Sequence, residues 1–343
     1  MKQQPETELY FVGTVGGFER PLLEQAEVKF AAWDEVQSGP FHGVNPARIL
    51  VSTVKLIVGT GQAFRLLRKR KPQVILSTGG WVSLPVALAA WVRRIPLVVF
   101  LPDIEPGLAI RVLRRFAERV AITVPESARY FRSGQTVVTG YPLRAAMLAA
   151  TREKAIEHFQ LDPARPTVLV FGGSRGSRAI NIALGNGLPE LLNGGIQVIH
   201  ITGTLDWERM QKQVQAFTGR KEYHASAYLH EMGPAMAAAD LVVCRAGASI
   251  LGEFPFFRLP SILIPLAYSW RYQEVNADYL TSRDAAVRLA EADLESELLP
   301  TIRRLLADPE RLEQMRSNAG KLAQPDGAKN LAQLLLELAQ RKI

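Results

Sequence analysis

The chain has 343 residues, 48% apolar and 22% charged, which is enough to bury the cores of about two domains and excludes a disordered protein. A single cysteine, Cys244, excludes a disulfide framework, and five histidines without an HxxxH spacing argue against a zinc centre. The net charge of +8 is uneven, because residues 40–145 hold 16 Lys or Arg against 4 Asp or Glu, which indicates a negatively charged partner on that side.

No targeting or membrane-spanning segment is expected. The first residues are polar and acidic, unlike the basic and then apolar layout of a secretory signal. The longest apolar runs, residues 82–92 and 95–101, are separated by Arg93 and Arg94. Both fall short of the roughly 20 residues that cross a bilayer. The sequence therefore predicts a soluble protein, and its one cysteine fits a reducing cytoplasm.

Short apolar runs alternate with helical patterns and fall into two series. The first series of expected strands comprises residues 8–13, 74–77, 97–101, 120–123 and 136–138. The second comprises residues 167–171, 197–201, 222–225, 241–244, 261–264 and 286–289. Strands that alternate with helices form parallel sheets through right-handed crossovers. The sequence therefore predicts two doubly wound, Rossmann-like α/β domains.

The expected domain boundary lies at residues 139–142, Thr-Gly-Tyr-Pro, where a strand ends in turn residues. A helical connector over 143–159 and a Pro-containing loop follow. A final amphipathic helix is expected from about residue 328 to the end. We expect one domain over 1–142 plus 326–343 and a second over 143–325.

Two basic segments, residues 47–71 and 108–120, mix apolar and cationic side chains at helical spacing. Such a surface docks on anionic lipid headgroups, at about 1 kcal/mol for each basic residue. The alternative is a solvated helix face that ends in a cationic turn. Nucleic acid is not an expected partner, because no nucleic-acid-binding signature accompanies the charge. The membrane-facing candidates are Arg65, Arg68, Lys69, Arg70, Arg111, Arg114 and Arg115.

The strongest motif is Gly-Gly-Ser-Arg-Gly-Ser at residues 172–177, which follows an apolar strand and opens a helix near Arg178. Glycines let the backbone approach a phosphate closely, and the helix start supplies free N–H groups. The motif is neither a Walker A loop nor a full GxGxxG. A tight strand-to-helix turn without a ligand is the alternative.

A second strand, loop and helix start covers residues 242–249, and Glu253 follows one turn into the helix. N–H groups at Ala248 and Ser249 could hold a diphosphate, and Glu253 could accept hydrogen bonds from both hydroxyls of a ribose. Glu253 as an ordinary solvated helix residue is the alternative. A further strand end leads to Gln273 at a helix start that we expect to face the same crevice.

The first domain carries a glycine pair of its own, in Ser-Thr-Gly-Gly-Trp-Val-Ser at residues 77–83. It again follows a strand and opens a helix, and it forms a second nest that suits an anion.

Together and in this order, the motifs resemble those of the MurG family of GT-B glycosyltransferases. That family moves N-acetylglucosamine (GlcNAc) from its UDP donor onto the undecaprenyl-linked muramyl-peptide precursor of peptidoglycan. The resemblance spans nearly the whole chain: Val-Gly-Thr, Gly-Gly-Trp-Val-Ser, Gly-Tyr-Pro-Leu-Arg, Gly-Gly-Ser-Arg-Gly, Cys-Arg-Ala-Gly-Ala and Gln-x-x-Asn-Ala. It implies a GT-B fold, two Rossmann-like domains with a cleft between them.

The resemblance also implies roles for single residues. Glu253 would hold the ribose and Gln273 the GlcNAc hydroxyls, while Tyr228 and Leu229 would border the uracil, although Tyr228 and Met232 could equally be core. The residues implied on the donor side are Arg144, Gly173, Ser174, Tyr228, Leu229, Arg245, Ala248, Ser249, Glu253 and Gln273. Those implied on the acceptor side are Gly79, Gly80, Trp81 and Ser83.

The chain departs from the family in three places. It begins at what would be the second strand, so the family's first βα unit, with the glycine-rich loop that carries the candidate base histidine, is expected to be absent through an incomplete gene or chain. Residues 100–103, Phe-Leu-Pro-Asp, replace the family's His-Glu-Gln-Asn. Arg175 replaces the usual Gln, and Ile250 stands where Thr is common.

An inverting transfer needs a base for the acceptor hydroxyl, and Asp103 is the candidate, with Glu105 a weaker one. The alternative is that Asp103 caps a helix that begins near Pro106. No metal or cofactor is expected, because the chain has no Asp-x-Asp motif, and helix starts with Arg144 and Arg245 can neutralise the diphosphate.

We therefore expect a UDP-GlcNAc-dependent, inverting hexosyltransferase of peptidoglycan synthesis, with a polyprenyl-linked lipid acceptor and an anionic membrane surface as partners. Its expected place is the cytoplasmic face of the cell membrane, as a peripheral protein. One alternative is a related GT-B transferase that glycosylates another lipid, such as diacylglycerol. The other is a non-catalytic nucleotide-sugar-binding homologue.

Overall fold

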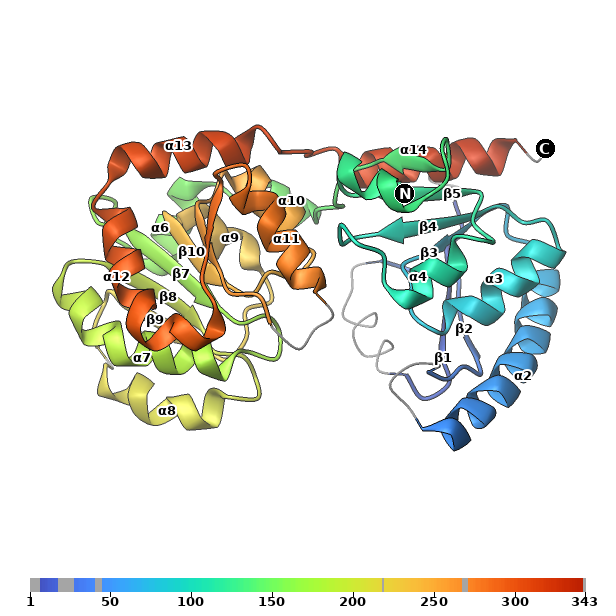
Figure 1. Ribbon diagram of the computed structural model, residues 1–343, viewed down its shortest axis with the longest axis horizontal. Coiled ribbons are helices and arrows are strands. Elements are labelled where there is room, and N and C mark those ends of the chain that lie inside the picture. Colours follow the sequence, from blue (N-terminus) through green and yellow to red (C-terminus); the bar gives the residue numbers. More distant parts are fainter. Residues whose placement is uncertain (1–6, 18–27, 41–44, 218, 267–270, 342–343) are drawn as a thin grey trace. The chain divides into compact units, whose positions relative to one another are not determined.

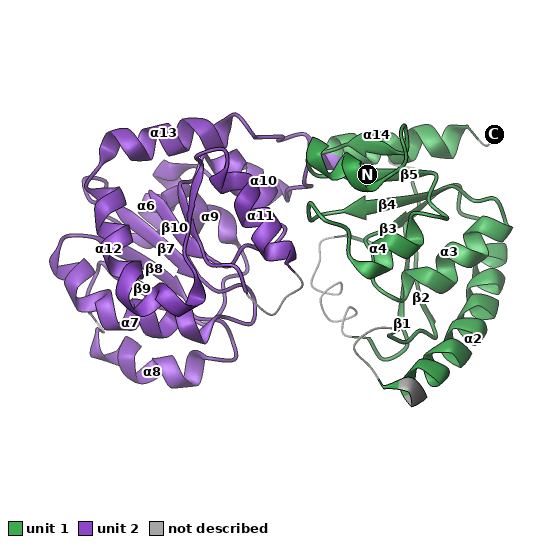
Figure 2. Ribbon diagram, viewed as in Figure 1, with its two compact units in different colours: residues 1–139, 329–343 green, residues 140–328 purple. Residues whose placement is uncertain are grey.

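The computed structural model describes residues 7–17, 28–40, 45–217, 219–266 and 271–341 (Figure 1). The chain divides into two compact units (Figure 2). Unit 1 comprises residues 1–139 and 329–343, and unit 2 comprises residues 140–328. The sequence predicted that the first domain covers residues 1–142 and 326–343. Each of the two boundaries between the units therefore lies three residues from its predicted position.

Unit 2 is built on one six-stranded parallel sheet. Its strands are β7 (Thr167–Phe171), β8 (Gln197–Ile201), β9 (Tyr223–Ser226), β10 (Leu241–Cys244), β11 (Ser261–Leu263) and β12 (Ala286–Arg288). They lie in the order β9-β8-β7-β10-β11-β12, with Val170 of β7 opposite His200 on one side and Val243 on the other. After β7, the chain adds β8 and β9 on one side of this strand and then β10, β11 and β12 on the other side. This order places a topological switch point between β7 and β10.

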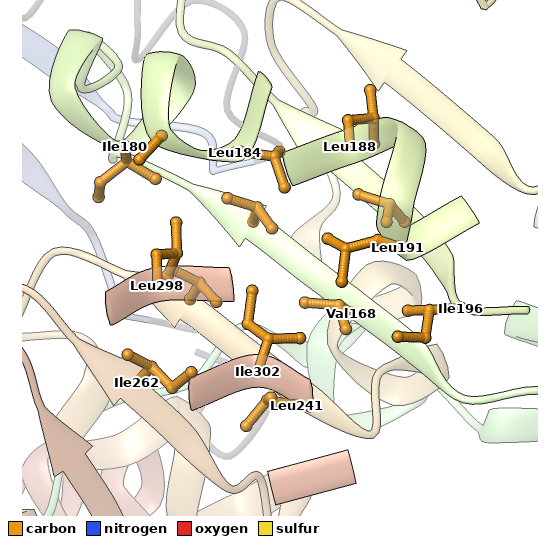
Figure 3. Close-up of a cluster of buried hydrophobic side chains, with 14 of the residues drawn as sticks. Val168, Ile180, Leu184, Leu188, Leu191, Ile196, Leu241, Ile262, Leu298 and Ile302 are labelled. Atoms are coloured by element: carbon orange, nitrogen blue, oxygen red, sulfur yellow. The ribbon is translucent and has the colours of Figure 1, made fainter. Parts of the chain in front are cut away.

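Helices cover this sheet and connect its strands. They are α5 (Ala145–Leu148), α6 (Arg152–Phe159), α7 (Arg178–Asn193), α8 (Trp207–Ala216), α9 (Met232–Ala238), α10 (Ile250–Phe257), α11 (Tyr272–Thr281), the 3-10 turn η2 (Glu291–Asp293), α12 (Leu294–Leu306) and α13 (Pro309–Gly320). The apolar faces of α7 and α12 pack on the sheet, where Leu184, Leu188 and Ile302 meet Val168 and Leu241 (Figure 3). Strands buried on both faces explain the near-continuous apolar runs of the sequence.

Unit 1 holds its described strands in two separate parallel sheets. One pairs β1 (Tyr10–Thr14) with β2 (Ala32–Val36). The other has the order β3 (Ile75–Ser77), β4 (Leu97–Leu101), β5 (Arg119–Ile122) and β6 (Thr136–Val138). The helices are α2 (Pro46–Arg70), α3 (Ser83–Val92), α4 (Leu108–Leu113), the 3-10 turn η1 (Pro125–Tyr130) and, from Lys329 on, α14 (Gly327–Gln340).

Two local expectations were wrong. Strand β2 was missed, because Asp34 and Glu35 interrupt its apolar alternation. The expected single connector helix over 143–159 is two helices, α5 and α6. Thr151 is the N-cap of α6 and its side chain accepts a hydrogen bond from the amide of Lys154, so the second helix begins anew.

Candidate functional site

The switch point of unit 2 opens into a hollow of about 630 Å³. Ligands of doubly wound sheets bind outside the carboxyl ends of the strands where the strand order reverses. The glycine-rich turn after β7 and the loop after β10 both lie there, so the two turns that the sequence analysis expected at one crevice do share it. The hollow is lined by Phe171, Gly172, Gly173, Ser174, Arg175, Gly176, Arg178, Leu205, Asp206, Arg245, Gly247, Ser249, Ile250, Leu266 and Gln273.

The turn after β7 is shaped by close backbone packing. Gly173 and Gly176 have φ angles of 89° and 82°, in the left-handed region that favours glycine. A Cβ atom on Gly203, which follows β8, would lie 2.1 Å from the Cα atom of Gly176. The two segments therefore touch through bare backbone, and this contact fixes the height of the turn above the sheet.

Open backbone amides lie just before α10, whose own first amides donate to the carbonyls of Gly247, Ala248 and Ser249. Neither Ser177, the N-cap of α7, nor Ser249, the N-cap of α10, forms a side-chain capping bond. In the described part of unit 2, no hydrogen bond donated by the amides of Ala248 and Ser249 is found. Open amides at a helix start, on the positive end of its dipole, suit a phosphate.

A buried hydrogen-bond network ends at Asp206, which lines the hollow. The ring nitrogens of His200 lie 2.9 Å from the Tyr223 hydroxyl and 3.0 Å from the Asn181 side-chain oxygen. The Asn181 amide in turn donates to the Thr202 carbonyl and to Asp206, both at 2.9 Å. Burial lowers the pKa of His200 to about 4 and raises the pKa of Tyr223. At neutral pH, Asp206 is therefore the charged member of this network.

Two of the arginines that line the hollow form ion pairs inside unit 2. Arg178 lies 3.4 Å from Asp206, a carboxylate that is only 8% exposed. Arg245, with a side chain 12% exposed, pairs with Glu291 and donates to the Ile264 carbonyl at 3.3 Å. The Arg245 guanidinium, expected from the sequence near the diphosphate, is thus already neutralised by a carboxylate.

Gln273 and Glu253 lie on neighbouring helix starts. The Gln273 side-chain oxygen accepts a hydrogen bond from the Leu266 amide at 3.0 Å, which turns the side-chain NH₂ group toward other acceptors. Glu253 is partly buried, and this burial raises the pKa of its carboxyl, while the hydrogen bond from Ser249 and the charge of Arg144 oppose the rise. Glu253 is therefore no solvated helix residue, although it is outside the lining of the hollow.

Other donor-side candidates lie apart from the hollow lining. Arg144 is exposed at the N-cap of α5. Tyr228 and Leu229 follow β9, and the Tyr228 ring is 45% exposed, 5.0 Å from the His230 ring. Ala248 stands between the lining residues Gly247 and Ser249. The roles expected for these residues remain predictions.

The acceptor-side candidates form a second strand-to-helix turn, in unit 1. Gly79 and Gly80 have successive φ angles of 97° and 78° after β3. The Ser83 hydroxyl donates to the Gly79 carbonyl at 2.6 Å, and Trp81 lies between them, partly buried. The Gly79 amide donates to the Ser77 hydroxyl at 3.2 Å, and the anion-binding role expected for this turn remains a prediction.

Asp103 lies in the loop after β4 and is partly buried. Helix α4 begins at Leu108, with Gly107 as its N-cap and no side-chain cap. The alternative role of Asp103, as the cap of a helix beginning near Pro106, is therefore wrong. Its role as a base remains a prediction.

Helix α2 carries an exposed apolar stripe that continues into basic residues. Leu50 and Ile57 are each 69% exposed, and Val54 and Val58 lie on the same face. The stripe ends in Arg65 and Arg68, which are exposed, as are Lys69 and Arg115. The other candidates are tied within unit 1: Arg70 to Asp34, Arg111 to Glu105 and Arg114 to the Tyr130 carbonyl.

The length and composition of α2 would also allow it to cross a membrane, and α2 is the one such helix among the described residues. This corrects the expectation that no segment is long and apolar enough. The same residue types occur in helices that lie on a membrane surface. No group of three or more His, Cys, Asp or Glu side chains that could hold a metal ion is found in the described part of the chain, outside which His42 lies.

Two family models match the chain. Residues 1–122 match the glycosyltransferase family 28 N-terminal domain, and residues 167–331 match the C-terminal domain of the same family. The boundary between these matches falls where the structure passes from unit 1 to unit 2.

Curated relatives match over almost the whole chain. One from Roseiflexus sp. is 38% identical, over 97% of this chain and 84% of its own length, and one from Halalkalibacterium halodurans is 32% identical, over 99% and 93%. Both are named UDP-N-acetylglucosamine--N-acetylmuramyl-(pentapeptide) pyrophosphoryl-undecaprenol N-acetylglucosamine transferase.

Solved structures share the fold. MurG from Acinetobacter baumannii superimposes with a TM-score of 0.73 at 22% identity, over 98% of this chain and 92% of its own. A UDP-GlcNAc 2-epimerase from Neisseria meningitidis, solved with UDP-GlcNAc bound, reaches a TM-score of 0.68 at 12% identity, over 98% and 93%.

Proposed function

The chain belongs to glycosyltransferase family 28, and from this premise we propose that it transfers GlcNAc from UDP-GlcNAc to N-acetylmuramyl-(pentapeptide) pyrophosphoryl-undecaprenol. It is a hexosyltransferase of peptidoglycan synthesis with the GT-B fold expected from its motifs. The observation that carries the proposal is the hollow at the switch point of unit 2, where two uncapped helix starts meet.

The donor binds in this hollow. The amides at Ser174, Ala248 and Ser249 receive the diphosphate, and helix starts supply the partial positive charge that it requires. Glu253 accepts hydrogen bonds from the ribose hydroxyls, and the free NH₂ group of Gln273 donates to the GlcNAc hydroxyls. Tyr228 and Leu229 border the uracil. This grip needs no metal ion or other cofactor.

The reaction is an inverting displacement at the anomeric carbon of GlcNAc. The acceptor hydroxyl oxygen bonds to that carbon while the bond to the diphosphate oxygen breaks. UDP leaves with the electron pair, and a base takes the hydroxyl proton. Fixed amide dipoles stabilise the leaving diphosphate because they are oriented before the reaction begins. Asp103, after β4 in unit 1, is the base that this chain offers among its described residues.

Unit 1 receives the lipid acceptor and docks on the membrane. The turn at Gly79, Gly80, Trp81 and Ser83 lies against the acceptor. The apolar stripe of α2 enters the headgroup region of the cytoplasmic leaflet, where Arg65, Arg68 and Lys69 meet anionic lipids. The protein is thus peripheral, at the cytoplasmic face of the cell membrane, next to its polyprenyl-linked substrate.

The test is a transfer assay with the purified chain, radiolabelled UDP-GlcNAc and the muramyl-peptide lipid in detergent. We expect labelled disaccharide lipid, at a rate that chelation of divalent metals leaves unchanged. Transfer of glucose or galactose to diacylglycerol, with none to the muramyl lipid, would assign the protein to another lipid. Absence of UDP-GlcNAc binding in calorimetry would indicate a non-catalytic homologue.

A further inference from the structure

Among the described residues, three arginines line the donor hollow: Arg175, Arg178 and Arg245. A diphosphate carries more negative charge than helix starts alone offset, so the availability of each guanidinium decides how the donor is held. The three differ in what they already bind within unit 2.

Arg178 and Arg245 are held by carboxylates. Arg178 pairs with Asp206, which is itself fixed by the buried amide of Asn181 at 2.9 Å. Arg245 is largely buried and pairs with Glu291. To bind a phosphate, each would have to leave a carboxylate partner or share its guanidinium with that partner.

Arg175 differs from both. It is exposed, and within the described residues of unit 2 it forms no ion pair and no side-chain hydrogen bond. Its backbone is nevertheless well placed, because it stands between Gly173 and Gly176, and Gly176 is packed on Gly203. The Arg175 backbone is thus held in place, while its long cationic side chain lines the hollow and can bind a ligand.

We propose that Arg175 is the side chain that binds the diphosphate of the nucleotide-sugar donor. Its planar guanidinium donates two hydrogen bonds to phosphate oxygens. When the bond between the anomeric carbon and the diphosphate oxygen breaks, the electron pair goes to that oxygen, and Arg175 stabilises the added charge without giving up a proton. This inference rests on the proposed function, because it requires a UDP-sugar in the hollow.

The lipid acceptor also contains a diphosphate, and the same guanidinium chemistry would suit it. The donor is favoured because Arg175 belongs to the turn whose amides lie on the same hollow as those of the α10 start. Binding of UDP to the free protein separates the two sources, since no acceptor is present.

The experiment is isothermal calorimetry of UDP and UMP with the wild-type chain, Arg175→Ala, Arg175→Lys and the control Arg304→Ala. Arg304 is an exposed arginine of α12 outside the hollow, so its loss removes the same charge from unit 2. We expect Arg175→Ala to weaken UDP binding about 10-fold and UMP binding about 2-fold or less. Arg175→Lys keeps the charge but loses the planar guanidinium with its two parallel donors. We therefore expect it to weaken UDP binding about 3-fold.

The outcomes separate this inference from the proposed function. If the wild-type chain binds UDP and Arg175→Ala binds it equally well, the inference is wrong while the donor site stands. If the wild-type chain binds neither nucleotide, the proposed function fails first. In the transfer assay, we expect a fall in kcat/KM for UDP-GlcNAc; a rise in the KM for the lipid alone would overturn the assignment to the donor. An unchanged Tm shows that the variant is folded.

Discussion

The two units differ in how their parallel sheets are built and in how much apolar helix surface they expose. Unit 2 has one sheet of six strands with helices packed on it, and its core runs without interruption from α7 to α12 (Figure 3). The described strands of unit 1 form two sheets, and its longest helix, α2, exposes an apolar stripe. Unit 2 therefore completes its own core, whereas unit 1 keeps apolar surface that suits an amphipathic partner.

The same contrast holds for the two glycine-rich turns. In unit 2, the turn is locked because Gly176 touches Gly203 backbone to backbone. In unit 1, a Cβ atom on Gly80 would meet nothing within 4 Å, and one on Gly79 would meet only the Ile110 side chain. The turn proposed to hold the nucleotide is therefore closely packed, while the turn expected to meet a large lipid substrate has open space around its glycines.

The largest effect is expected from a substitution that disrupts the contact between Gly176 and Gly203 in unit 2. We expect Gly203→Ala to lower the free energy of unfolding by roughly 3 to 5 kcal/mol, because a Cβ atom there both collides with Gly176 and sits on a left-handed backbone. UDP binding should be lost as well. Urea denaturation and calorimetry measure the two effects.

Gly195→Ala is the matched control for this variant. Gly195 has a φ angle of 80°, like the 85° of Gly203, but a Cβ atom there meets nothing within 4 Å. We expect Gly195→Ala to lower the free energy of unfolding by about 1 to 2 kcal/mol, from backbone strain alone, and to leave UDP affinity unchanged. Equal effects of the two substitutions would contradict the locked turn.

A second prediction uses pH to sharpen the view of unit 2 as a preset core. The unfolded chain binds a proton at His200 near its ordinary pKa of 6.5, and the folded chain only near 4, because burial disfavours the charged ring. Protons therefore favour the unfolded chain between these values. The free energy of unfolding should fall by up to about 3 kcal/mol from this residue as the pH drops from 6.5 to 4.

His200→Gln isolates this contribution. We expect denaturation curves of the variant to depend less on pH over this interval than those of the wild type. His158→Gln, at an exposed position of α6, serves as the control and should leave the wild-type dependence in place. A His200→Gln protein with the full wild-type dependence would show that His200 is not the group involved.

A third prediction concerns the donor site itself. Glu253→Ala should weaken UDP binding by roughly 1.5–3 kcal/mol, about 10- to 150-fold, if the carboxylate accepts hydrogen bonds from the ribose. Glu310→Ala, an exposed glutamate of α13, should have no effect. Unchanged affinity in the Glu253 variant, measured by calorimetry, would remove this residue from the site.

The smallest expected effect tests unit 1. The double variant Leu50→Asp with Ile57→Asp should reduce partition onto vesicles with anionic lipid about 10-fold, because two apolar side chains no longer enter the interface. Its Tm should be unchanged, since both positions are exposed. Ile182→Asp, an exposed site of unit 2, should leave partition as it is. Equal sedimentation of all three proteins with vesicles would exclude α2 as the docking surface.

Much of unit 2 was predictable from local sequence. Three of its strands, β7, β8 and β10, were expected with the observed bounds, because fully buried parallel strands are continuous apolar runs between turn residues. The glycine-rich turn after β7 was equally visible. In unit 1, β2 was missed because Asp34 pairs with Arg70, a contact 36 residues away that makes a polar strand acceptable.

The site divides in the same way. Gly173, Ser174, Arg245, Ser249 and Gln273 were identified from the sequence and line the hollow. Arg175 was noted only as a departure from a family pattern. The pairing of Arg245 with Glu291, 46 residues later, was not foreseen, because it depends on how β10, β11 and β12 lie side by side.

The alternation of strands and helices, each glycine-rich turn and the basic surface of α2 could be predicted from local sequence, because they depend on residues close together along the chain. That β7 and β10 are neighbours, and therefore that their turns share one hollow, follows from the three-dimensional fold. It also decided that Arg178 and Arg245 form ion pairs with Asp206 and Glu291. Strand order and ion pairing join residues far apart along the chain, and no local pattern encodes such long-range contacts.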